Sequence, residues 1–106
     1  MLTPNVNLNG KTILVTGAAG FIGSNLVMEL LRTLENVTIV GLDNMNDYYD
    51  VSIKEYRLQE IDKLAGTKLN SKWIFVKGNL ADKVLIEQLF TDYGFAVVVN
   101  LAAQAG

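Results

Sequence analysis

The chain has 106 residues, enough for one small domain with a modest core. A net charge of −2 without a dense Lys/Arg cluster argues against nucleic-acid binding, and the absence of Cys and His excludes disulfides, thiolate nucleophiles and most zinc sites, so no metal site is expected. No apolar run approaches the ~18 residues of a membrane span, so no membrane association is expected. The first residues do not resemble a signal peptide, so a cytoplasmic location is expected.

Strand-like and helix-like segments alternate along the chain after a polar stretch, residues 1–10, that is expected to be a flexible arm. Strands are predicted where apolar and β-branched residues run together, at residues 11–16, 37–42, 73–77 and 95–101. Helices are predicted where apolar residues recur every three or four positions, at residues 21–34 and 52–64 and from a cap at Asp82 to about residue 93. Their expected inward residues are Ile22, Leu26, Val27, Leu30, Leu31 and Leu34 in the first helix, Ile53, Tyr56, Ile61 and Leu64 in the second, and Leu85, Ile86, Leu89 and Phe90 in the third.

This order of elements predicts an α/β fold, a Rossmann-like doubly wound parallel sheet, because right-handed crossovers make successive strands parallel. The expected strand order is 3-2-1-4, which is one mononucleotide-binding half plus the first strand of a second half. A hydrophobic content of 50% agrees with strands that are covered on both faces. Residues 95–101 would form an edge strand, and an edge this apolar predicts that residues 11–106 are the N-terminal part of a larger domain whose remainder, with the substrate domain, is absent. For the same reason the chain is expected to self-associate through that strand.

Three glycines at a spacing of three residues separate the first predicted strand from the first predicted helix. Gly17 allows a sharp turn, Gly20 lets backbone N–H groups approach a ligand, and Gly23 lets the helix pack closely on the strand. The helix N-terminus then offers N–H donors and a partial positive charge to phosphates. The alternative is a purely structural turn. The strand before the glycines and the helix after them favour instead a site for a dinucleotide pyrophosphate, formed by Gly17, Ala19, Gly20, Phe21, Ile22 and Gly23.

Asp43 ends the second predicted strand, 20 residues after Gly23. A carboxylate in that place accepts hydrogen bonds from the adenosine ribose hydroxyls and repels the 2′-phosphate of NADP, so NAD is the expected cofactor. The alternative is an aspartate that only ends a strand.

The segment from Val15 to Ser24 resembles the start of an extended short-chain dehydrogenase/reductase of the nucleotide-sugar epimerase and dehydratase type, and the likeness extends over residues 11–106. Residues 41–54, with their Asn-Asp-Tyr-Tyr-Asp loop, and residues 100–106 resemble the UDP-glucuronate 4-epimerases more narrowly. The resemblance implies an NAD-binding portion of such an enzyme, a UDP-sugar substrate, a role in polysaccharide biosynthesis and a homodimeric full-length protein.

The resemblance also implies further cofactor contacts. Asn44 would help to position the adenosine, the loop containing Asn79 and Leu80 would touch the adenine ring, and the backbone after the last strand would run under the cofactor at Leu101, Ala102, Ala103 and Gln104. Relatives often have aspartate at the place of Asn79 and histidine at the place of Asn100. The alternative for Asn79 is a loop residue that only precedes the third helix.

Catalysis in this family uses a Tyr-x-x-x-Lys pair. The residues four positions after Tyr48, Tyr49, Tyr56 and Tyr93 are Ser52, Ile53, Glu60 and Val97, so no catalytic residue is assigned in this chain. The implied reaction moves a hydride from C4 of the sugar to NAD and back through a 4-keto intermediate. Another nucleotide-sugar epimerase, dehydratase or decarboxylase, and a non-catalytic NAD(P)-sensing regulator, are the alternative functions.

Overall fold

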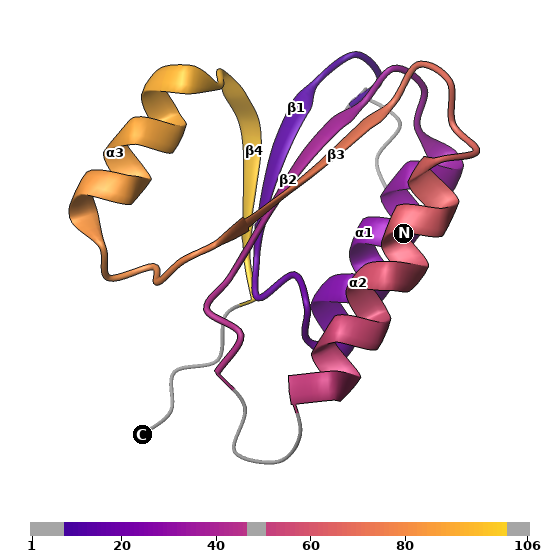
Figure 1. Ribbon diagram of the computed structural model, residues 1–106. Helices are drawn as coiled ribbons and strands as arrows, with labels where there is room; N and C mark the ends of the chain where they lie inside the picture. Colours follow the sequence, from indigo (N-terminus) through magenta and orange to yellow (C-terminus); the bar gives the residue numbers. More distant parts are fainter. Residues whose placement is uncertain (1–7, 47–50, 102–106) are drawn as a thin grey trace.

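The structure is a computed structural model that describes residues 8–46 and 51–101. Its elements follow one another as β1 (Thr12–Thr16), α1 (Phe21–Thr33), β2 (Thr38–Asp43), α2 (Val51–Ala65), β3 (Lys72–Lys77), α3 (Lys83–Asp92) and β4 (Phe95–Asn100) (Figure 1). All the predicted strands and helices are therefore confirmed, with ends close to the predicted ones.

The four strands form one parallel sheet in the order β3-β2-β1-β4, as predicted. β1 and β2 lie in the middle and are almost entirely buried, whereas β3 and β4 form the two edges. Because the strands are parallel, their carboxyl ends meet along one edge of the sheet, where ligands bind in open α/β sheets.

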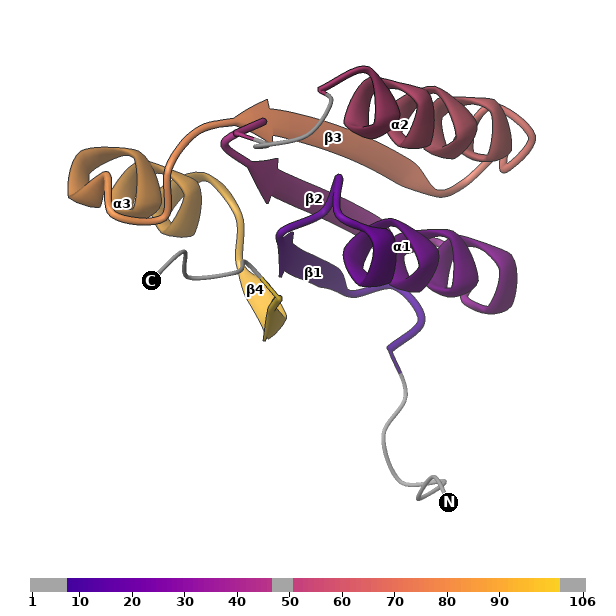
Figure 2. The same cartoon turned by 90° about the horizontal axis from the view of Figure 1, so that it is seen from below.

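The helices cover the sheet unequally. α1 and α2 lie side by side on one face, and α3 alone lies on the other (Figure 2). Successive residues of β1 alternate between the two layers: Ile13 and Val15 belong to the core under α1 and α2, and Leu14 belongs to the core under α3. The first core also contains Ala18, Val27, Leu31, Val37, Ile39 and Ile61, and the second contains Val40, Leu42 and Leu89.

The prediction that a helix residue faces inward is wrong at several positions. Ile22 is 67% exposed, because the row of α1 that meets the sheet is Gly23, Val27 and Leu31. In α2, the predicted inward residues Ile61 and Leu64 pack in the core together with Leu58. Ile53 and Tyr56 are exposed because they lie outside this row. The remaining wrong residue is Phe90 of α3, which is half exposed at the flank of the lone helix.

Residues 8–10 are attached to the loop before β2. Gly10 donates to the Glu35 carbonyl at 2.9 Å, and Asn9 Oδ1 accepts from the Glu35 N–H at 2.7 Å. Leu8 packs against the core under α1 and α2. The other residues of the expected arm, 1–7, lie outside the described part of the chain. Within the described ranges, no helix has the length and apolar character needed to cross a membrane.

Candidate functional site

The glycine turn leaves β1 at the carboxyl edge of the sheet and is anchored to β2. Gly17 has a φ of +72°, which favours glycine, and its N–H donates to the Leu42 carbonyl at 2.8 Å. The Ala18 N–H reaches the same carbonyl at 3.2 Å, and the Gly20 N–H closes the turn onto the Gly17 carbonyl at 3.0 Å. The predicted sharp exit from β1 is therefore present.

Gly23 lets α1 approach the turn closely. A Cβ atom at this position would stand 2.0 Å from the Gly17 carbonyl oxygen and 2.8 Å from its carbon, both of them backbone atoms. The first α-helical hydrogen bond joins the Ser24 N–H to the Gly20 carbonyl at 2.9 Å. The N–H groups of residues 21–23 precede that bond, so they have no partner within the helix and are available to an anion.

Asp43 is assembled with the glycine turn although it is the last residue of β2. Its side chain is nearly buried, and Oδ2 accepts the Ala19 N–H at 2.9 Å. Oδ1 accepts the Met45 N–H at 2.8 Å and the Lys54 ammonium at 3.0 Å. The structure thus places the two predicted halves of a dinucleotide site, the turn and the acid, in direct contact.

Two basic residues of α2 at this site were missed by the sequence analysis. Lys54 bridges Asp43 and the Asn46 carbonyl, which lies 3.1 Å from its Nζ. Arg57 Nη1 donates to the Ala19 carbonyl at 3.3 Å, and its guanidinium carbon lies 5.9 Å from the centre of the Phe21 ring. Their i, i+3 spacing on a predicted helix was a signal that they share a face, but nothing in the sequence indicated that this face meets the glycine turn.

The loop after β3 is built mainly as the entrance to α3. Asn79 Oδ1 accepts the Ala81 N–H at 2.8 Å, and Asp82 caps the helix by accepting the Leu85 N–H at 3.1 Å, as predicted. Leu80 packs in the core under α3. The Asn79 side chain thus stabilises the loop before α3, which agrees with its alternative interpretation as a loop residue. An adenine contact from this loop stays a prediction.

Asn44 does not share the contacts of Asp43. It is exposed and its Oδ1 accepts the Asn46 N–H at 2.8 Å, so it shapes the start of the loop. The predicted positioning of adenosine by Asn44 is not tested by these contacts.

The end of β4 is tied to the end of β1. The Leu101 N–H lies 3.1 Å from the Thr16 carbonyl oxygen and 3.0 Å from its Oγ1, and the Thr16 hydroxyl donates to Asn100 Oδ1 at 2.5 Å. Leu101 is therefore held beside the end of β1, and its predicted place under a cofactor stays a prediction. The other three residues expected there, Ala102, Ala103 and Gln104, lie outside the described residues.

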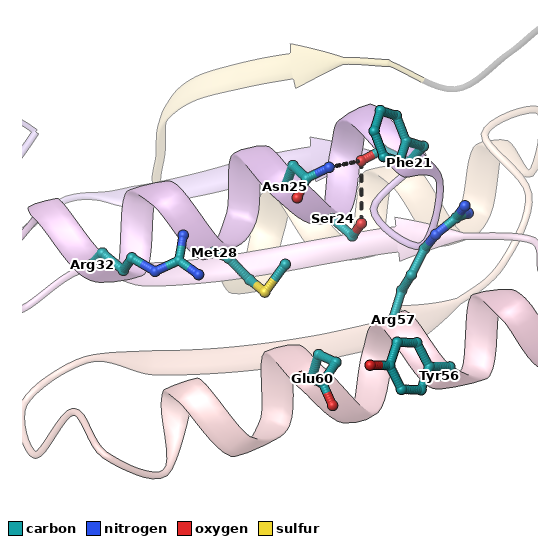
Figure 3. A pocket seen from close by; sticks show the side chains of 8 residues that line it. All are labelled: Phe21, Ser24, Asn25, Met28, Arg32, Tyr56, Arg57 and Glu60. Atoms are coloured by element: carbon teal, nitrogen blue, oxygen red, sulfur yellow. Dashed lines mark hydrogen bonds between the residues drawn. The ribbon is translucent and has the colours of Figure 1, made fainter.

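A separate shallow hollow of about 330 Å³ lies between α1 and α2. Figure 3 shows Arg57 extending along it toward Phe21, whose carbonyl accepts hydrogen bonds from Ser24 and Asn25. Phe21 is 69% exposed, and the hollow contains neither Asp43 nor Lys54. Among residues 8–46 and 51–101, no cluster of acidic side chains is placed to hold a metal ion.

The sheet order and the helices on both of its faces define a Rossmann-like doubly wound protein, here with four strands. Residues 14–106 match the family model described as GDP-mannose 4,6 dehydratase, and the chain belongs to that family of short-chain dehydrogenase/reductase-type proteins.

Relatives of known name resemble most of the chain. UDP-glucuronate 4-epimerase 4 of Arabidopsis thaliana is 43% identical over 98 residues, which cover 92% of this chain and 20% of the relative. Protein CapI of Staphylococcus aureus is 44% identical over 94 residues, which cover 89% of this chain and 25% of the relative. The chain thus spans a fifth to a quarter of the length of these relatives.

Solved structures agree with the fold. UDP-glucuronic acid 4-epimerase from Bacillus cereus, in complex with UDP-glucuronic acid and NAD, is 35% identical with a TM-score of 0.70, over 90% of this chain and 27% of that one. dTDP-glucose 4,6-dehydratase from Bacillus anthracis, in complex with NAD, is 32% identical with a TM-score of 0.71, over 89% of this chain and 27% of that one.

Proposed function

We propose that this chain is the NAD-binding portion of a nucleotide-sugar epimerase, with UDP-glucuronate as the substrate of the whole protein. The observation that carries the proposal is the Ala19 N–H bond to Asp43 at 2.9 Å, because it assembles a phosphate-binding turn with a ribose-binding acid. The identity to UDP-glucuronate 4-epimerases supports the choice of sugar.

The residues fit NAD at its pyrophosphate end. The close approach of Gly23 to Gly17 leaves no room for a side chain, and the N–H groups of residues 21–23 are directed beyond the start of α1. These donors and the positive end of the helix would hold the pyrophosphate. Asp43 would accept a ribose hydroxyl, and the backbone at Leu101 would line the crevice between β1 and β4.

NAD in such a protein would supply the acceptor for a hydride from C4 of the sugar and then return it. The chain described here would contribute the binding and orientation of that group. A nucleotide-sugar 4,6-dehydratase is the second candidate, favoured by the description of the family model and by the similarity to dTDP-glucose 4,6-dehydratase.

Backbone NMR of the chain during titration with NAD tests the cofactor. The amide signals of Ala19, Gly20 and Gly23 should shift, and those of the exposed face of α3 should not. Since the described residues form a sheet of four strands, which is one mononucleotide-binding half plus one strand, we expect weak affinity. Unchanged signals at millimolar NAD would contradict the proposal. For the substrate, the longer protein that contains this chain should convert UDP-glucuronate in preference to UDP-glucose, with a 4,6-dehydratase assay as the competing outcome.

A further inference from the structure

Lys54 and Asp43 form an ion pair that is largely removed from solvent. The side chains are 14% and 4% exposed, and the distance from Nζ to Oδ1 is 3.0 Å. The expected repulsion of a 2′-phosphate by Asp43 assumes a negative charge without a partner. Here the ammonium cancels that charge, and Arg57 adds a second positive group beside Ala19.

The hydrogen bonds of this pair can be counted on both partners. A carboxylate has about four lone-pair sites, and those of Asp43 already accept Ala19, Met45 and Lys54. Asp43 can therefore accept about one ribose hydroxyl in this arrangement. Among the described residues, the ammonium of Lys54 uses two of its three donors, on Asp43 and on the Asn46 carbonyl.

The charge of Lys54 lies next to the carboxylate that would hold the ribose. Because Oδ1 of Asp43 already accepts two hydrogen bonds, a ribose hydroxyl would bond to Oδ2. Two hydrogen bonds of about 3 Å, with about 2 Å between the carboxylate oxygens, keep that ribose oxygen within about 8 Å of the Lys54 Nζ. At that separation, inside a partly desolvated site, one charge changes an affinity by roughly tenfold or more.

Given the proposed dinucleotide site, we propose that Lys54 makes its ribose end tolerant of a 2′-phosphate, so that the chain binds NADP to within about tenfold of NAD. Lys54 then sets the choice between the two cofactors, and Asp43 alone does not. The ligand class is a pyridine dinucleotide with or without a 2′-phosphate.

The test compares Kd values for NADP and NAD, measured by NMR titration, in the wild-type chain and two variants. Lys54→Met should raise the ratio Kd(NADP)/Kd(NAD) by about tenfold or more, because Asp43 loses its counter-charge. Lys63→Met removes the same charge from an exposed position of the same helix and should leave the ratio unchanged. Lys54→Arg should keep it near the wild-type value.

A second measurement needs no variant. Raising the ionic strength of the wild type from about 0.05 to about 0.5 M should increase the ratio, because screening weakens the attraction of Lys54 for the 2′-phosphate. If NAD binds but NADP does not, or if Lys54→Met and Lys63→Met give equal ratios, the inference is overturned and the proposed function stands. If NAD itself does not bind, the proposed function fails and the inference fails with it.

Discussion

The two faces of the sheet differ in how completely they are covered. Under α1 and α2, the strand residues Ile13, Val15 and Ile39 are sealed from solvent, and the helices contribute fully buried residues of their own. Under α3, the buried residues of the described part of the chain are Leu14, Val40, Leu42 and Leu89, and the flanks of that layer are more exposed. Val98 in β4 and Phe90 in α3 are about half exposed.

The face under α1 and α2 is therefore more tightly packed than the face under α3. The glycine turn, Asp43 and Lys54 all join β1 or β2 to α1 or α2, so the proposed pyrophosphate and ribose contacts rest on the better packed layer. The loop expected to meet adenine leads into α3, which rests on the weaker layer. We therefore expect local opening to begin at α3.

Truncation of one buried side chain on each face tests this comparison most directly. Ile39→Ala should cost about 4 kcal/mol, because the cavity lies between helices and strands that hold one another in place. Leu89→Ala should cost about 2 kcal/mol, since Leu89 is less completely buried than Ile39 and the lone helix can settle into the space. Urea unfolding followed by circular dichroism measures both, and equal losses would remove the distinction.

Gly23→Ala should disrupt the better packed face at the site itself. Its Cβ would overlap the backbone of Gly17, so α1 must move away from the turn at a cost of roughly 2–3 kcal/mol, and NAD binding should be lost. Gly94→Ala is the matched control, because nothing lies within 4 Å of its added Cβ. Retention of the NAD-induced shifts in Gly23→Ala would show that the close approach is not required.

Removing the cap of α3 should loosen the second face alone. Asp82→Ala deletes the acceptor of the Leu85 N–H and should cost about 1 kcal/mol. Hydrogen exchange should accelerate in α3 and hardly change in α1. If both helices exchanged faster together, the two faces would be one cooperative unit.

A substitution on the open edge should have the smallest effect on folding. Val98 is 46% exposed, so Val98→Lys should change the free energy of unfolding by less than about 0.5 kcal/mol. Within the described residues β4 pairs only with β1, and we expect the wild-type chain to self-associate through its free side. Light scattering should show less association in Val98→Lys; a monomeric wild type at high concentration would contradict this expectation.

Most of the fold could be predicted because its signals are local. Apolar runs indicate the strands, apolar residues that recur every three or four positions indicate the helices, and the glycine turn marks the junction between a strand and a helix. The right-handedness of the crossover connections then specifies the topology of the sheet. The inward faces of the helices were predicted less well. Ile22 and Tyr56 belong to apolar patterns yet are exposed, because the closest helix approach is set at Gly23 and by the packing of Ile61.

The residues of the candidate site also divide into those that could be predicted from the sequence and those that could not. Gly17, Gly23 and Asp43 could be found from their spacing, because their roles depend on backbone geometry at the end of a strand. Lys54 and Arg57 could not, because their contacts depend on how α2 is placed across the turn. The Thr16–Asn100 bond was missed for a similar reason, since only a sheet pairing brings the two residues together.

The Thr16–Asn100 bond also bears on the order in which the chain acquires its structure. Its partners are 84 residues apart, so β1 stays without its second neighbour until the chain has been extended through β4. Contacts at such sequence separation close slowly, because a long loop must be ordered before they form. The glycine turn is therefore synthesised well before the strand that supports it, and that support is fixed only after β4 has joined the sheet.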